Sequence, residues 1–213
     1  MSSAAANQPL HIGVFGGAFD PPHQAHVALA KAALAQLALD TLHIVPTGQA
    51  WHKARQLSAA ADRLAMTRLA FSGLERVVVD EREIQRAGPS FTVDTLEALQ
   101  AEYPGANLYL ILGADQVAAL PNWHRWQEVL KIAIICIAGR AYDTRAEGVF
   151  NPEFYAGQPV QTLQLPLMPV SATDIRQQIA CPLPGLSGLP RWHALVPEPV
   201  ARYIERHQLY LSS

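Results

Sequence analysis

Several residue types that mark common classes of protein are scarce in this chain. Lysine occupies only three of the 213 positions, 31, 53 and 131, and the formal net charge is -2. The isoelectric point is about 6.4. A protein that holds a long nucleic acid by its phosphates usually needs a net basic surface. The charge balance therefore argues against a nucleic-acid partner and favours a small-molecule ligand.

Cysteine and long apolar runs are scarce too. Cys136 and Cys181 form no C-x-x-C pair, which favours two reduced thiols in a cytosolic protein, with a disulfide as the alternative. No apolar run approaches the roughly 20 residues that a membrane-spanning helix needs. Residues 1–9 lack the basic start and apolar centre of a signal peptide. We therefore expect a soluble, cytoplasmic protein with no membrane partner and a disordered tail at residues 1–9.

Strand and helix patterns alternate along the rest of the chain, and half of the residues are hydrophobic. The predicted strands are 10–15, 41–45, 76–79, 108–112 and 132–138, and Cys136 lies in the last of them. The predicted helices are 24–39, 58–72 with Ser58 as its cap, 92–103, 123–130, a helix from 171, and 197–208. Continuous apolar strands between helices indicate a mostly parallel sheet covered on both faces. We predict a single α/β domain over residues 10–213, with a Rossmann-like open sheet and a C-terminal helical segment.

Four loops follow the carboxyl ends of predicted strands. They contain Gly16-Gly17, Pro46-Thr47, Gly113 and Gly139-Arg140. Open parallel sheets bind ligands beyond these strand ends, near the point where the strand order reverses. The sequence therefore predicts one pocket where the four loops meet.

Residues 15–26 form the first motif with a chemical meaning, Phe-Gly-Gly-Ala-Phe-Asp-Pro-Pro-His-Gln-Ala-His. Glycines let the backbone approach a phosphate closely, and a helix N-terminus offers N–H groups to it. His23 and His26 are spaced so that both imidazoles leave one face of the first helical turn and donate to phosphate oxygens. Singly, Gly-Gly is often a plain tight turn and two histidines are often surface residues. The combination is much rarer than its parts.

This motif differs from the two commonest phosphate-binding loops. The chain contains no Gly-Lys pair, so it has no Walker loop, and it lacks the G-x-G-x-x-G dinucleotide fingerprint. The two histidines also lack an evident third ligand nearby, so the motif does not predict a metal site.

The second motif begins a late helix with Ser171, Thr173, Asp174 and Arg176. A capping box accounts for Ser171 and Asp174 without any function. It does not account for Thr173 and Arg176. A hydroxyl and a guanidinium on one helical turn are typical of a second phosphate site.

The two motifs resemble the G-G-T-F-D-P-x-H-x-G-H and S-x-T-x-I-R signatures of the nucleotidyltransferases. Further stretches at 86–96, 112–115, 120–124 and 196–204 narrow the resemblance to bacterial nicotinate-nucleotide adenylyltransferases, in register from about residue 10 to 211. Two positions depart from the pattern. Ala18 replaces the usual Thr and removes a hydroxyl near the phosphates, and Ala25 replaces the usual Gly, where a methyl would crowd the adenosine side. Both changes bear on ATP affinity more than on the reaction.

The resemblance implies transfer of AMP from Mg·ATP to nicotinate mononucleotide, which gives deamido-NAD and pyrophosphate. A phosphate monoester has a second pKa near ~6, so the acceptor phosphate is already largely deprotonated and attacks without a protein base. The protein then supplies positioning and charge stabilisation. Mg²⁺ is expected to arrive with ATP and to keep water ligands, without a dedicated protein site.

The resemblance also implies roles for individual residues. The expected phosphate contacts are His23 and His26 at the α- and β-phosphates, Lys53 as a loop clamp, and Ser171, Thr173 and Arg176 at the outgoing pyrophosphate. The rest of the expected ATP site is Phe15, Gly16, Gly17, Gly113, Asp115 and Arg140. The expected acceptor site is Ser90, Thr92 and Trp123. There the indole would stack on the pyridine ring, and the N–H groups at 90–92 would receive the nicotinate carboxylate. The alternatives are a solvated loop lysine for Lys53 and a core tryptophan for Trp123.

Three other functions remain to be weighed against this one. A related enzyme acting on nicotinamide mononucleotide or phosphopantetheine shares the phosphate motifs, although the 86–96 and 120–124 stretches argue against phosphopantetheine. A nucleotide-binding regulator is disfavoured because both histidines, Lys53 and Arg176 are retained. A fragment of an aminoacyl-tRNA synthetase is disfavoured by the short chain and its acidic balance. The sequence makes no prediction of oligomeric state.

Overall fold

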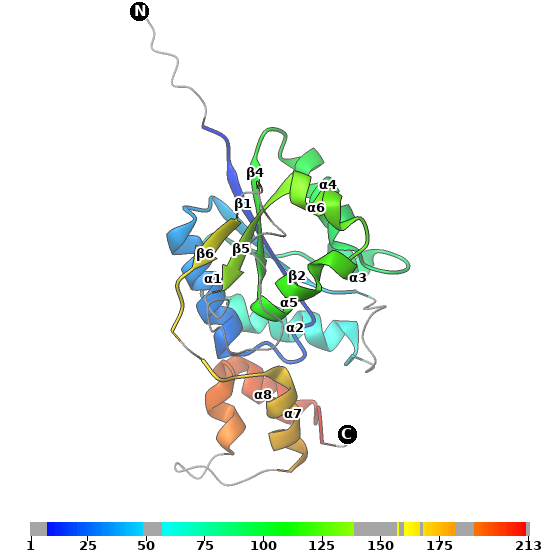
Figure 1. Cartoon of the computed structure of the whole chain (residues 1–213). Helices are drawn as coiled ribbons and strands as arrows, with labels where there is room; N and C mark the ends of the chain where they lie inside the picture. Colours follow the sequence, from blue (N-terminus) through cyan, green and yellow to red (C-terminus); the bar gives the residue numbers. More distant parts are fainter. Residues whose placement is uncertain are drawn as a thin grey trace, which may run out of the picture.

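A parallel sheet forms the centre of the protein (Figure 1). The computed structural model describes residues 8–48, 57–138, 157, 160–166, 168–181 and 190–211. In these residues, six strands lie in the order β3-β2-β1-β4-β5-β6, and all neighbouring pairs are parallel. The strands are β1 His11–Gly17, β2 Thr41–Pro46, β3 Val77–Val79, β4 Asn107–Leu112, β5 Ala133–Ala138 and β6 Val160–Leu163. This confirms the predicted α/β class.

Helices cover both faces of the sheet. The α-helices are α1 Gln24–Gln36, α2 Ala60–Phe71, α3 Arg82–Gln85, α4 Thr92–Glu102, α5 Ala114–Ala119, α6 Trp126–Ile132, α7 Ala172–Ala180 and α8 Glu198–Arg206. Two 3-10 turns, η1 Leu120–Asn122 and η4 Arg191–Leu195, complete the described helical structure. Figure 1 shows α7 and α8 together at the end of the molecule opposite the first described residues of the chain.

The side chains of β4 show how the two faces are separated. Leu108 and Leu110 pack in the core beneath α4, α5 and α6, whereas Tyr109 and Ile111 pack in the core beneath α1, α2, α7 and α8. Successive strand residues point to opposite faces, so a strand buried on both sides reads as a continuous apolar run. The C-terminal helices thus share one hydrophobic core with the sheet.

The strand order reverses between β1 and β4. The chain adds β2 and β3 on one side of β1 and then crosses back to place β4 on the other side. β1 pairs with β2 as far as Gly17 but with β4 only as far as Val14. Because the two strands part there, a crevice opens at their carboxyl ends, where parallel sheets bind ligands.

Several predicted boundaries are wrong for local backbone reasons. The first helix ends at Gln36 instead of Leu39, because Ala38 has a left-handed φ of 46°. The helix predicted from Trp123 begins at Trp126, because Arg125 has a φ of 51°. Neither backbone conformation continues an α-helix. Helices α3 and α5 and strand β6 were not predicted, since each is too short to show a periodic pattern.

Ser58 does not cap α2. The N-cap residue is Ala59, with no side-chain cap, and the Ser58 N–H instead donates to Asp20 Oδ2 at 3.2 Å.

Both cysteines are free thiols, Cys136 buried in β5 and Cys181 exposed, so the disulfide alternative is wrong. Burial raises the pKa of Cys136 to about 12. Among the described helices, none has the length and apolar content to cross a membrane.

Candidate active site

A cavity of about 890 Å³ lies at the carboxyl ends of β1, β2 and β4. Gly16, Gly17, Thr47 and Gly113 line it, so three of the four predicted loops meet there. The fourth loop, with Gly139 and Arg140, lies outside the described residues, as does Lys53. Of the other residues singled out from the sequence, those that line the cavity are Phe15, His23, His26, Ser90, Thr92, Asp115, Trp123, Thr173 and Arg176.

The two histidines of the first motif lie ring against ring at the start of α1. Their ring centroids are 3.6 Å apart and their planes differ by 20°. His26 Nδ1 accepts a hydrogen bond from the His23 backbone N–H at 3.1 Å, and Phe19 packs edge-on against the His26 ring. In neutral His26 the proton therefore sits on Nε2, which makes this nitrogen the donor.

His23 is buried and stays neutral at neutral pH. His23 is the N-cap residue of α1, and it lines the cavity. Desolvation lowers the pKa of His23 to about 4 because burial penalises the charged form. In the free protein this imidazole is a neutral hydrogen-bonding group.

The second motif reaches the first through Arg176. Its Nη1 donates to the carbonyl oxygen of Asp20 at 2.7 Å across 156 residues of sequence, and its Nη2 donates to Thr173 Oγ1 at 3.1 Å. Ser171 Oγ accepts the Asp174 N–H at 3.1 Å and donates to Asp174 Oδ2 at 2.7 Å. Ser171 therefore caps α7, as the capping-box interpretation predicts, and it does not line the cavity.

Arg63 was not found from the sequence, yet it joins the loops around the cavity. It is 2% exposed in α2. Its guanidinium donates to the carbonyls of Ala18 at 3.1 Å, Thr47 at 2.7 Å, Gly48 at 3.3 Å and Ser58 at 3.0 Å. Burial lowers the pKa of Arg63, and the nearby charge of Asp20 opposes that shift. An arginine on the apolar face of the predicted helix was its only sequence signal.

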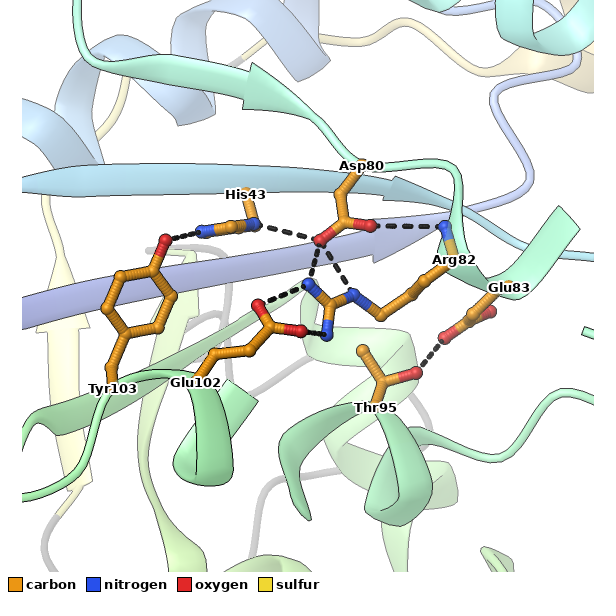
Figure 2. A network of polar contacts seen from close by, with 7 residues as sticks. All are labelled: His43, Asp80, Arg82, Glu83, Thr95, Glu102 and Tyr103. Carbon is orange, nitrogen blue, oxygen red and sulfur yellow. Dashed lines mark hydrogen bonds and ion pairs between the residues drawn. The ribbon is translucent and has the colours of Figure 1, made fainter. Parts of the chain in front are cut away.

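The opposite wall of the cavity is built on α3 and α4. Glu83 is buried, and its Oε1 accepts the Thr95 hydroxyl at 2.8 Å (Figure 2). Burial raises the pKa of Glu83 above its ordinary value, although the Thr95 hydrogen bond opposes the shift. The Ser90 hydroxyl donates to the Glu83 carbonyl at 3.4 Å. A Cβ at Gly48 would lie 2.0 Å from that carbonyl, so only glycine lets the loop after β2 pack against α3.

A network of charges holds this wall from behind (Figure 2). Asp80 accepts hydrogen bonds from His43 Nδ1 at 2.9 Å and from Arg82 Nε at 2.7 Å. Arg82 then donates through Nη1 and Nη2 to Glu102 at 2.9 and 3.0 Å. Burial alone would raise the pKa of Asp80, but its hydrogen bonds with His43 and Arg82 hold the pKa far below its usual range.

Trp123 and Thr92 complete this wall. Thr92 is the first residue of α4, and Trp123 lies between η1 and α6. Trp123 is partly buried against the core beneath α4–α6 and also lines the cavity. It therefore serves as both core residue and wall, so the two sequence interpretations of Trp123 are compatible.

Gly113 and Asp115 lie beside each other at the start of α5. A Cβ at Gly113 would lie 2.7 Å from Asp115 Oδ1, so a side chain there would displace the carboxylate. Gln116 Nε2 donates to Asp115 Oδ2 at 3.0 Å. Ala18 lines the cavity and Ala25 does not, and the expected effects of both residues on ATP affinity stay predictions. No group of three His, Cys, Asp or Glu side chains that could hold a metal occurs in the described part of the chain.

Comparison with known proteins agrees with this geometry. A model of a family described as cytidylyltransferase-like matches residues 14–178. The "probable nicotinate-nucleotide adenylyltransferase" of Albidiferax ferrireducens is 56% identical over 199 residues, which cover 93% of this chain and 97% of the relative. The protein of the same name from Methylibium petroleiphilum is 38% identical, and the match covers 96% of this chain and 94% of the relative. The chain belongs to the nicotinate-nucleotide adenylyltransferase family.

Solved structures show the fold of this family at low sequence identity. The nicotinic acid mononucleotide adenylyltransferase of Plasmodium falciparum, complexed with APC, superposes with a TM-score of 0.76 at 15% identity, and 94% of this chain and 97% of that chain are covered. Its complex with NaAD gives a TM-score of 0.74 at the same identity and coverage. Membership of the nicotinate-nucleotide adenylyltransferase family argues against a regulator, a phosphopantetheine enzyme and an aminoacyl-tRNA synthetase fragment.

Proposed function

We propose that this protein transfers the adenylyl group of Mg·ATP to the phosphate of nicotinate mononucleotide and releases pyrophosphate. The product is deamido-NAD, so the enzyme serves NAD biosynthesis. The observation that carries the proposal is that both signature motifs meet in one cavity, through the Arg176 hydrogen bond to Asp20. Family membership supports the same reaction. We place the enzyme in the cytoplasm, with small molecules as its partners.

The phosphate wall of the cavity consists of His23, His26, Thr173 and Arg176. We assign the two imidazoles to the α- and β-phosphates and the α7 residues to the outgoing pyrophosphate. A Cβ at Gly16 would meet nothing within 4 Å, so the backbone there is open to a phosphate. Ser171 contributes through the cap that positions α7. The assignments of Lys53 and Arg140 rest on the sequence resemblance.

The acceptor wall consists of Ser90, Thr92 and Trp123. We assign the nicotinate carboxylate to the Thr92 hydroxyl and the N–H groups at the start of α4, because helix N-termini stabilise anions. The Ser90 hydroxyl is already engaged with Glu83, so Ser90 acts through its backbone. Trp123 offers its ring to the pyridine. Phe15, Gly113 and Asp115 also line the cavity, and we assign them to the nucleoside of ATP.

This arrangement requires no protein nucleophile. The acceptor phosphate, with a second pKa near ~6, attacks the α-phosphorus in line and displaces pyrophosphate. His23 and His26 donate hydrogen bonds to oxygens on which charge increases, and Arg176 neutralises charge at the leaving group. Mg²⁺ offsets phosphate charge when bound, and ATP itself supplies its ligands together with water.

Pyrophosphate release with Mg·ATP tests the proposal, with nicotinate mononucleotide and nicotinamide mononucleotide compared at equal concentration. We expect kcat/KM to be at least about tenfold higher with the acid, because its carboxylate gains charge-assisted hydrogen bonds that the amide lacks. Mass spectrometry of the product should identify deamido-NAD. Equal rates would contradict the acceptor site. Binding of ATP without turnover of either acceptor would contradict the enzyme itself.

A further inference from the structure

The last described residues of the chain return to the phosphate wall. After α8 ends at Arg206, the backbone turns through Gln208 and Tyr210, whose φ angles are 52° and 68°. Residues other than glycine rarely adopt such left-handed conformations, which persist when tertiary contacts impose them. Here the contact is a hydrogen bond from the Tyr210 hydroxyl to Asp20 Oδ1 at 2.7 Å, across 190 residues of sequence.

Asp20 connects this C-terminal contact to the cavity. The residue is 2% exposed and lies within the first motif. Its carboxylate accepts the Tyr210 hydroxyl and the Ser58 N–H, whereas its backbone carbonyl accepts Arg176 Nη1 at 2.7 Å. The orientation of the Arg176 guanidinium therefore depends on the same residue that Tyr210 holds in place.

The Tyr210 hydroxyl is suited to a permanent donor role. Burial is the main cause that raises the pKa of Tyr210 far above its usual value, and the adjacent Asp20 carboxylate adds to the shift. The phenol therefore stays protonated at neutral pH and donates to Asp20. Tyr210 does not line the cavity, so it acts through Asp20.

We propose that Tyr210 is a positioning residue for adenylyl transfer, because it fixes Asp20 and thereby the carbonyl that orients Arg176. This inference rests on the proposed function. It makes the C-terminal segment part of the active-site architecture, although the segment does not line the cavity.

Tyr203 provides a matched control for the test. Its hydroxyl donates to Asp62 Oδ1 at 2.9 Å and so ties α8 to α2 instead of to Asp20. Tyr210→Phe and Tyr203→Phe each remove one phenolic hydroxyl that bonds a carboxylate. We expect Tyr210→Phe to lower kcat by about tenfold, because displacing a transition-state contact costs rate. The kcat of Tyr203→Phe should stay within about twofold of the wild-type value, and the two variants should have similar melting temperatures.

A double-mutant cycle separates positioning from general stability. If Tyr210 acts through Arg176, then Tyr210→Phe should change kcat less than about twofold in an Arg176→Lys background. The affinity for a non-hydrolysable ATP analogue, measured by calorimetry, should fall in Tyr210→Phe and not in Tyr203→Phe.

Two results would overturn the inference. One is wild-type kcat in folded Tyr210→Phe, and the other is an equal loss of kcat with and without the Arg176 substitution. If Tyr210→Phe folds poorly, the same cycle is run with Tyr210→His, which keeps a ring donor and should recover part of the lost kcat. An inactive wild-type enzyme would instead contradict the proposed function, since that is measured before any substitution.

Discussion

The two walls of the cavity are held together in different ways. On and behind the phosphate wall, arginine side chains donate to backbone carbonyls. Arg176 donates to Asp20, and Arg63 donates to four carbonyls in the segments that follow β1 and β2. These contacts join segments that are 5 to 156 residues apart. On the acceptor wall, Arg82 donates to the carboxylates of Asp80 and Glu102, 2 and 20 residues away.

This difference matches what each wall is expected to bind. A carbonyl oxygen fixes the orientation of a guanidinium without carrying a full negative charge, whereas a carboxylate neutralises it. Arg82 is paired with two carboxylates, and it acts as internal support for α3 and α4. On the phosphate side, Arg176 and Arg63 donate to backbone carbonyls, and the charge of Asp20 lies near Arg63. We infer that the phosphate wall presents the Arg176 guanidinium, which lines the cavity, to its ligand, while the acceptor wall relies on shape and a helix N-terminus.

Arg176→Ala should have the largest effect, because it removes charge from the phosphate wall. We expect kcat to fall by about 10²- to 10³-fold, as for loss of a donor that acts in the transition state. Steady-state pyrophosphate release would measure the loss. Arg202→Ala, at an exposed ion pair with Glu198, is the control and should retain wild-type kcat. A fall in kcat of less than about tenfold for Arg176→Ala would mean that adenylyl transfer does not depend on the charge of this wall.

The buried His23 should make stability depend on pH. Its pKa is about 4 in the folded protein against 6.5 when unfolded, so the unfolded chain binds more protons between these values. The contribution of neutral His23 to the free energy of unfolding is therefore fully present above pH 6.5. It is lost as the pH falls to 4, which lowers the free energy of unfolding by about 3 kcal/mol. Urea unfolding from pH 4 to 7 measures the slope. His23→Asn should flatten it, and an unchanged slope would show that His23 titrates normally.

Asp80→Asn tests the acceptor wall, where we expect a structural effect. Removing this charge from between His43 and Arg82 should lower the free energy of unfolding by about 2 kcal/mol. Denaturant unfolding measures this loss. Glu81→Gln is the control, because Glu81 pairs with Arg68 at an exposed site. This substitution should lower the free energy of unfolding by less than about 0.5 kcal/mol. We expect kcat of Asp80→Asn to stay within about threefold of wild type. A large fall in kcat with intact stability would remove the distinction between the walls.

The smallest effect is expected at Ser171. Ser171→Ala should destabilise the protein by about 1 kcal/mol through loss of the α7 cap, and Ser171→Asn should restore most of it. Thermal unfolding measures both, and pyrophosphate release should change less than about twofold in the Asn variant. Loss of activity in a fully stable Ser171→Asn variant would show instead that the serine hydroxyl contacts the phosphates.

Much of the fold was readable because its signals are local. Four of the five predicted strands are buried on both faces and therefore appear as apolar runs, whereas the edge strand β3 exposes Val78. All five occur in the structure. Helix ends at Ala38 and Arg125 were missed, since their left-handed conformations occur at residues that do not usually adopt them. The cavity was located in advance because carboxyl ends of parallel strands lie at one edge of a sheet. Lys53 and Arg140, outside the described residues, stay predictions.

The sequence by itself determined the order of five strands and of the longer helices along the chain, the two motifs and the chemistry that these motifs can perform. Only the tertiary structure decided that Arg176 bonds to Asp20, that Arg63 joins the segments that follow β1 and β2, and that Tyr210 holds Asp20 from the C-terminal segment. The physical reason is that apolar periodicity and capping depend on neighbouring residues, whereas a buried arginine or tyrosine acquires its role from partners far along the chain. Those partners meet only when the sheet and its helices have packed.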